Sequence, residues 1–234
     1  PLQFCEFLAY KTALAYESED RIRTYLTKYC QGISRIVFFD SGGGRTLADA
    51  QGYGFVFEQK AFVIFRGTES DNDWVINRTD ALTDTLQNPN DNRRKKLVAR
   101  YGDLLAKTGD PSPGRHAGFA IAWASIKDDV ERWLKDVLDT GDAMSIIYSG
   151  HSLGGAMALL GAFDHAREHK PHWISGVVTF GAPLVGGAAF VEAYKRELGD
   201  RTVLLESSGD IVPAIMRRWY YRKLYFLRQW VQAG

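Results

Sequence analysis

A serine flanked by glycines is the residue of this chain best suited to chemistry. Residues 150–154 read Gly-His-Ser-Leu-Gly and fit the pattern G-x-S-x-G, with Ser152 at its centre. In that pattern a strand turns sharply into a helix and presents the serine hydroxyl as a nucleophile. A Cβ at Gly150 or Gly154 would clash with the neighbouring backbone in such a turn. The five residues alone fit a structural serine in a turn equally well.

The residues on either side of the pentapeptide favour the nucleophile. Ile146 and Ile147 precede it, as expected of a buried strand, and residues 156–160 are apolar, as expected of a buried helix. We therefore interpret Ser152 as the nucleophile of an elbow between a strand and a helix.

The elements that must position this serine can be read from apolar spacing. Residues 2–28 have helical periodicity with a polar break at 17–20, which predicts two helices covering one face of a sheet. Further helices are expected at 119–141 and 187–198, and strands at 36–39, 53–57, 61–65, 174–180 and 202–205. Strands that alternate with helices predict an α/β protein with a mostly parallel sheet. Residues 61–65 are continuously apolar, which predicts a central strand that delivers residues 66–68 to the functional edge.

The segment from 69 to 115 is polar and lacks regular periodicity. A stretch of this length inside a domain is usually a functional loop, so we expect a lid or insertion at 69–115 within a single domain spanning 1–234. Trp74, Ile76, Leu82 and Leu86 are available as its apolar residues, and the basic run at 93–96 is interpreted as a solvated helix face.

Composition excludes several classes of function. The 234 residues carry a net charge of +1, which argues against a general nucleic-acid binder. No apolar run approaches a membrane span and no signal-peptide core is visible, so we expect a soluble protein, either secreted or cytoplasmic. Cys5 and Cys30 could form one disulfide or remain reduced, and the compartment stays open.

Five short stretches, taken in order, resemble the class 3 or fungal-type lipase family of α/β-hydrolases. They are Phe-Arg-Gly-Thr at 65–68, His-Ala-Gly-Phe at 116–119, the elbow at 150–156, Phe-Gly-Ala-Pro-Leu-Val-Gly at 180–186 and Gly-Asp-Ile-Val-Pro at 209–213. The resemblance implies an α/β-hydrolase fold, with a mostly parallel sheet, helices on both faces and a lid-like insertion.

The resemblance also implies an esterase or lipase of acylglycerols or phospholipid acyl chains that needs neither metal nor organic cofactor. Ser152 would attack the ester carbonyl, and Asp210 would orient a histidine base. The oxyanion would be held by the backbone N–H groups of Thr68 and Leu153, with the Thr68 hydroxyl as a third donor.

The catalytic histidine of this scheme is not identified, because no histidine follows Asp210. His151 and His116 match family positions that are not the base, and His165 lies thirteen residues beyond Ser152 along the next helix, too far to reach it. Three interpretations stay open: the histidine lies outside this sequence, it has been substituted, or another group is the base. Lys223 is a poor substitute because lysine holds its proton at neutral pH.

Two further patterns have competing interpretations. His165, His169 and His172 imitate a metal-binding spacing, but no H-E-x-x-H carboxylate accompanies them and we predict no metal site, taking their helix to be an outer one. Residues 217–230 mix cations with large aromatics, which suits a lipid interface or, as we prefer, a terminal element packed on the body.

The sequence thus supports two hypotheses. One is a serine hydrolase of carboxylic esters that acts through an acyl-Ser152 intermediate, with transient contact to a lipid interface. The alternative is a catalytically impaired protein of lipase fold that binds lipid or a protein partner, because the histidine is absent. Substrate head group, acyl chain length and oligomeric state are not readable from the residues.

Overall fold

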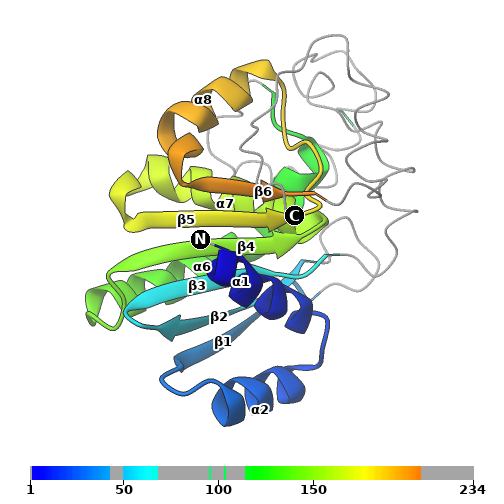
Figure 1. The fold of residues 1–234 in the computed structure, drawn as a ribbon. Helices are drawn as coiled ribbons and strands as arrows, with labels where there is room; N and C mark the ends of the chain where they lie inside the picture. The colour runs from blue at the N-terminus through cyan, green and yellow to red at the C-terminus, as the bar shows by residue number, and fades with distance from the viewer. Residues whose placement is uncertain (1, 43–49, 68–94, 96–102, 104–113, 207–234) are drawn as a thin grey trace.

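In the part of the chain that the structure describes, six strands form one sheet in the order in which they occur along the sequence (Figure 1). The computed structural model describes residues 2–42, 50–67, 95, 103 and 114–206. The strands are β1 (Ser34–Asp40), β2 (Gln51–Phe57), β3 (Lys60–Phe65), β4 (Ser145–His151), β5 (Ile174–Phe180) and β6 (Thr202–Leu205). Strands β1, β2 and β3 pair antiparallel, whereas β3 to β6 pair parallel. All the strands expected from the sequence are present, and the mostly parallel sheet is confirmed.

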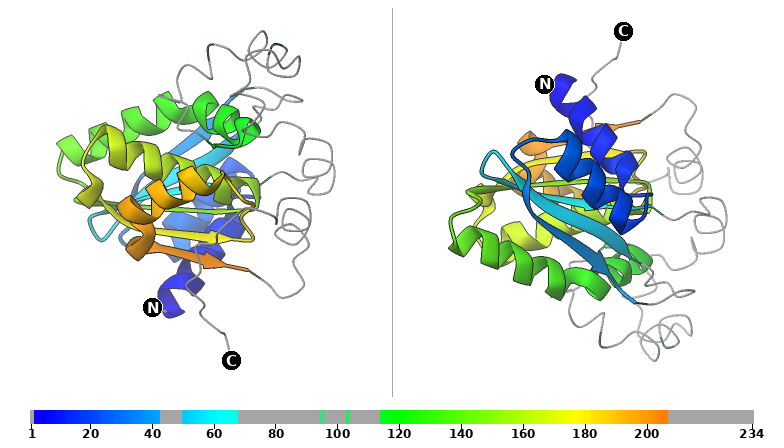
Figure 2. Two further views of the ribbon diagram at one scale, coloured as in Figure 1. Left: turned by 90° about the horizontal axis from the view of Figure 1, so that it is seen from above. Right: turned by 90° about the horizontal axis from the view of Figure 1, so that it is seen from below.

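Helices cover both faces of this sheet, as Figure 2 shows from two sides. On one face lie α1 (Leu2–Leu14) and α2 (Glu19–Tyr29), and on the other lie α6 (Ala117–Asp139), α7 (Leu153–Glu168) and α8 (Ala188–Leu198). Two short 3-10 turns, η1 (Pro171–Trp173) and η2 (Gly199–Arg201), precede β5 and β6. The three helices that connect parallel strands share one face, as crossover connections of one hand require.

The break between the first two helices is set by a cap. The side chain of Ser18 accepts a hydrogen bond from the Arg21 N–H, and Glu19 and Asp20 lie in the first turn of α2. A serine cap with acidic residues behind it satisfies free N–H groups and complements the helix dipole. Helix α2 therefore begins at Glu19, slightly earlier than the polar break at 17–20 had indicated.

Strand β3 is the central strand that its apolar sequence predicted. Ala61, Val63 and Phe65 face the core under α6, α7 and α8, while Phe62 and Ile64 face the core under α1 and α2. All five side chains are buried. Because β3 is fixed on both faces, the position of its carboxyl end is fixed too.

Helix α7 is buried along nearly its whole length, so the expectation of an outer helix around His165 is wrong. The described buried residues of α7 run from Leu153 to Ala166 without a gap. A helix that is apolar all round is one enclosed by protein. None of the described helices combines the length and apolar character that crossing a bilayer demands.

Candidate active site

Ser152 stands at the junction of β4 and α7 in a backbone conformation that side chains rarely adopt. Its φ is 52° and its ψ is −122°, between the end of β4 at His151 and the start of α7 at Leu153. The Ser152 N–H donates to the Phe180 carbonyl over 3.0 Å, and the Ser152 carbonyl accepts from the Ala156 N–H over 3.2 Å. A non-glycine residue in such a region is strained by about 1–3 kcal/mol. The backbone is thus the sharp turn that the pentapeptide predicted.

The two glycines of the pentapeptide allow this turn to close. A Cβ on Gly150 would lie 2.2 Å from the Gly154 carbonyl oxygen, and a Cβ on Gly154 would lie 2.3 Å from the Phe65 carbonyl oxygen. Real Cβ atoms do not approach oxygen that closely, so side chains at either position would force the strand and helix apart. This confirms the steric reason inferred from the sequence.

The carboxyl end of β3 passes directly beside the serine. Phe65 pairs with Gly150 across the parallel ladder, and a Cβ placed on Gly67 would lie 3.3 Å from the Ser152 Cβ and 2.9 Å from the His151 carbonyl oxygen. Leu153 is the first residue of α7 and is buried. The first N–H groups of a helix have no intrahelical partner and carry the positive end of the dipole. A developing negative charge at Ser152 would therefore meet donors from the start of α7.

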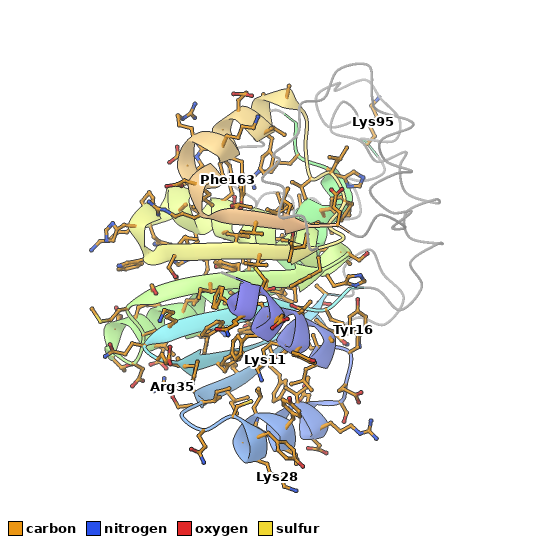
Figure 3. All side chains as sticks on the ribbon, viewed as in Figure 1. Lys11, Tyr16, Lys28, Arg35, Lys95 and Phe163 are labelled. Carbon is orange, nitrogen blue, oxygen red and sulfur yellow. The ribbon has the colours of Figure 1, made fainter. Side chains whose placement is uncertain are left out.

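Helix α1 and the turn that follows it hold the elbow from the opposite face of the sheet. The Thr12 and Ser149 hydroxyls lie 2.9 Å apart, and the Tyr16 hydroxyl lies 2.7 Å from Nδ1 of His151, the residue before Ser152. Figure 3 shows Tyr16 toward the carboxyl ends of the parallel strands. The sequence analysis did not identify Tyr16 or Thr12. Thr12 and Tyr16 are four residues apart, and their partners Ser149 and His151 are two residues apart on β4. This match can be seen only once the position of α1 against β4 is known.

The start of α6 is tied to α7 and to the loop after β5. Arg115 forms a buried ion pair with Asp164, with 2.6 Å between Nη2 and Oδ1, and Trp123 Nε1 donates to the other Asp164 oxygen over 2.9 Å. The backbone of 114–116 pairs with that of 185–187 through His116 N–H to Val185 O and Gly187 N–H to Gly114 O. Two of the stretches that carried the resemblance, at 116–119 and 180–186, are therefore neighbours in space.

The family model for lipase (class 3) matches residues 62–219, which is more than half of the chain. The chain belongs to the class 3 lipase family.

Relatives of this class 3 lipase family member come from plants and fungi. A phospholipase A1-Igamma2, chloroplastic, of Arabidopsis thaliana is 30% identical over 158 residues, covering 64% of this chain and 30% of the relative. A lipase of Rhizopus niveus is 29% identical over 196 residues, covering 80% of this chain and 43% of the relative. The chain therefore spans less than half the length of these two proteins.

The structure of this chain also resembles solved lipase structures. A solved triacylglycerol lipase, whose catalytic centre is described as a serine protease triad, superposes with a TM-score of 0.66 at 21% identity. The match covers 94% of this chain and 77% of that one. The α/β-hydrolase fold is thereby confirmed.

The described histidines of this class 3 family member make contacts with residues other than Ser152. His151 contacts Tyr16, as above. His116 is buried directly before the first residue of α6, and its ring stacks on Phe119 with centroids 4.2 Å apart. Burial lowers its pKa to about 4. The neutral ring is therefore its stable form near neutral pH, consistent with a supporting role for His116.

His165 lies far along α7, as its position in the sequence indicated. Burial, with the positive charges of His169 and Lys127, lowers its pKa to about 4. His165 and His169 have ring centroids 4.6 Å apart. The group that could hold a cation among the described residues is a different one, Glu131, Glu168 and His169. The ammonium of Lys127 already lies 2.7 Å from Glu168, so that carboxylate has a cation beside it.

Several predicted residues lie outside the described part of the chain. They are Thr68, Asp210, the residues of the expected lid apart from 95, 103, 114 and 115, and the aromatic and basic stretch at 217–230. Their roles stay predictions. The structure brings together Ser152, Leu153, the end of β3 and the 180–186 loop.

Proposed function

We propose that this member of the class 3 lipase family hydrolyses carboxylic esters through an acyl-Ser152 intermediate. The observation that carries the proposal is the strained turn at Ser152, with φ of 52°, placed beside the carboxyl end of β3. The names of the relatives, a phospholipase A1 and a lipase, favour esters of glycerolipids as the substrate class.

Each step of acyl transfer except the proton transfer has a proposed group in this chain, because the histidine base is not identified in this sequence. The Ser152 oxygen attacks the ester carbonyl, and the oxyanion accepts hydrogen bonds from the N–H groups of Leu153 and Thr68, with the Thr68 hydroxyl as a third donor. Asp210 orients the histidine that takes the serine proton and later gives it to the leaving alcohol. Removing one oxyanion donor costs about 3 kcal/mol in comparable sites. No metal or organic cofactor enters this scheme.

We further propose a single domain over 1–234 in which residues 69–115 form a lid over the cleft. A lid that opens at a lipid surface would make hydrolysis faster on aggregated than on monomeric ester. Equal rates below and above the concentration at which the ester aggregates would contradict the lid.

The alternative function is a lipase-fold protein that binds lipid or a partner without turnover. It is favoured by one observation, the lack of a histidine after Asp210. A triad that has lost one member can still retain about 10³-fold catalysis over water. Both functions are compatible with the elbow, so the rate of ester hydrolysis is what distinguishes them.

A burst assay with a p-nitrophenyl ester separates them, with Ser152→Ala as the control. An acyl-enzyme burst and covalent labelling by a fluorophosphonate, both lost in Ser152→Ala, would support the hydrolase. Absence of both from the natural full-length protein would refute it and leave the binding function. Free imidazole added to the assay tests the base: an increased rate that depends on Ser152 indicates that an imidazole is missing from the site.

A further inference from the structure

Lys11 is a buried lysine whose side-chain nitrogen contacts a thiol. Only 3% of the residue is exposed, and its Nζ donates a hydrogen bond to Cys30 Sγ over 2.9 Å. The rings of Phe7 and Tyr25 lie 5.1 and 4.9 Å from the same nitrogen. Figure 3 shows Lys11 on α1, against the sheet and on the side of the molecule that bears α2.

The surroundings of this ammonium supply aromatic faces rather than carboxylates. Within the described residues, none of the ion pairs involves Lys11. A buried charge is costly unless it is paired, and aromatic faces compensate only part of that cost. The Cys30 sulfur is the hydrogen-bond acceptor that the structure gives this nitrogen.

Cys30 is also placed where an oxidant can reach it. It follows the last residue of α2, its thiol forms no disulfide, and it is partly exposed. A thiolate next to a lysine is the reactive form of cysteine, and a partly exposed one is open to oxidation. The pair thus combines a nucleophilic sulfur with an amine in direct contact.

We propose that Lys11 and Cys30 form an oxidant-sensitive modification site, in which hydrogen peroxide converts their contact into a sulfur–nitrogen bond. The Cys30 thiolate attacks one peroxide oxygen, which breaks the O–O bond, gives a sulfenic acid and releases hydroxide. Hydroxide takes a proton from the Lys11 ammonium, and the amine attacks the sulfenic sulfur and displaces water. Sulfur is oxidised by two electrons, and one peroxide is reduced to two waters. This inference is independent of ester hydrolysis.

The bond would join α1 to the end of α2. Helix α1 is held on the sheet by contacts next to Lys11, because the Tyr53 hydroxyl donates to the Lys11 carbonyl over 2.7 Å and Thr12 contacts Ser149. The cross-link therefore forms without displacing α1. Thiol reductants would reverse it, because thiolate attacks oxidised sulfur.

The experiment treats the protein with hydrogen peroxide in a Cys5→Ser background, in which Cys30 is the one remaining cysteine of the chain. A disulfide within the chain is then impossible. The expected product has lost two hydrogens in intact mass. After trypsin, the Lys11 bond resists cleavage, and residues 1–21 appear joined to residues 29–35 until a thiol reductant separates them.

Two variants make the test specific to this contact. Lys11→Met keeps side-chain length without the amine, and we expect no cross-link and a higher yield of dimedone-trapped Cys30 sulfenic acid than in the parent, because no amine competes for the sulfenic sulfur. Lys28→Met removes an exposed lysine two residues from Cys30, and it should cross-link like the parent. Dimedone trapping with equal yield in parent and Lys11→Met, or oxygen addition without a joined peptide in the parent, would overturn the proposal.

Should Lys11→Met lose its fold, the parent alone still decides the matter through the joined peptide. A circular dichroism melt of each variant before oxidation identifies that case.

Discussion

Replacing His165 by leucine should make the protein less sensitive to acid. The histidine is 4% exposed within α7, and neither of its ring nitrogens has a hydrogen-bond partner among the described residues. Burial first, and then the positive charges of His169 and Lys127, lower its pKa to about 4 from 6.5. Leucine has similar bulk and no proton to bind.

Acid should destabilise the folded protein through His165, because the unfolded chain binds a proton there at higher pH than the folded chain does. Between pH 6.5 and 4 the unfolded chain protonates this imidazole and the folded chain does not. The folded state is therefore fully favoured above pH 6.5 and loses stability as pH falls toward 4. A shift of this size corresponds to about 3 kcal/mol when complete and to about 2 kcal/mol by pH 5. His116, whose pKa is also about 4, adds a similar loss that the variant retains.

Urea denaturation at pH 7.5 and pH 5, followed by tryptophan fluorescence, measures the effect. The parent should lose about 2 kcal/mol more than His165→Leu on going to pH 5. His172→Leu is the matched control, because His172 is exposed, and it should lose as much as the parent. The same loss for His165→Leu as for the parent would refute the assignment of a buried neutral ring.

Three further substitutions test the elbow and its supports. Ser152→Gly should be more stable than Ser152→Ala by about 1 kcal/mol, because glycine relieves positive-φ strain at some entropic cost, and an equal midpoint in thermal melts would contradict the strain. Tyr16→Phe removes the hydrogen bond to His151, so it should lower kcat with little change in KM and lower the free energy of unfolding by about 1 kcal/mol. Tyr10→Phe, at a residue 72% exposed, should leave both kcat and the free energy of unfolding unchanged. Arg115→Met should lower the free energy of unfolding, measured in urea, by about 3–5 kcal/mol, because it leaves the buried Asp164 carboxylate without its cation. The double variant with Asp164→Leu should recover most of that loss, and no recovery would show that the ion pair is not the cause.

The sequence predicted the strands and the elbow well because their determinants are local. A short apolar run such as 61–65 is typical of a central strand. Glycine is required at 150 and 154 because a Cβ there would lie 2.2 Å from the Gly154 oxygen and 2.3 Å from the Phe65 oxygen, respectively. The family resemblance then supplied the order of the motifs. Local pattern and global fold agree in this part of the chain.

The supports of the elbow could not be predicted in the same way. Tyr16 reaches His151 across 135 positions, and Arg115 reaches Asp164 because two helices cross. The burial of α7 around His165 was not predicted either, because the partners of the polar side chain of Asp164, Trp123 and Arg115, come from a distant part of the chain. Polar contacts between residues far apart in the chain produce no repeating pattern in the sequence from which they could be predicted.

The conformation of Ser152 bears on the choice between the hydrolase and the silent binding protein. Packing explains the glycines of the elbow, because close contacts between β3, β4 and α7 require them whether or not the protein is an enzyme. Packing does not explain the serine, whose φ of 52° would be adopted at lower cost by glycine. A side chain held at a strained position by surrounding structure is the usual signature of a group that must be presented to a ligand. The strained turn at Ser152 therefore supports the proposed hydrolase over the proposed binding protein.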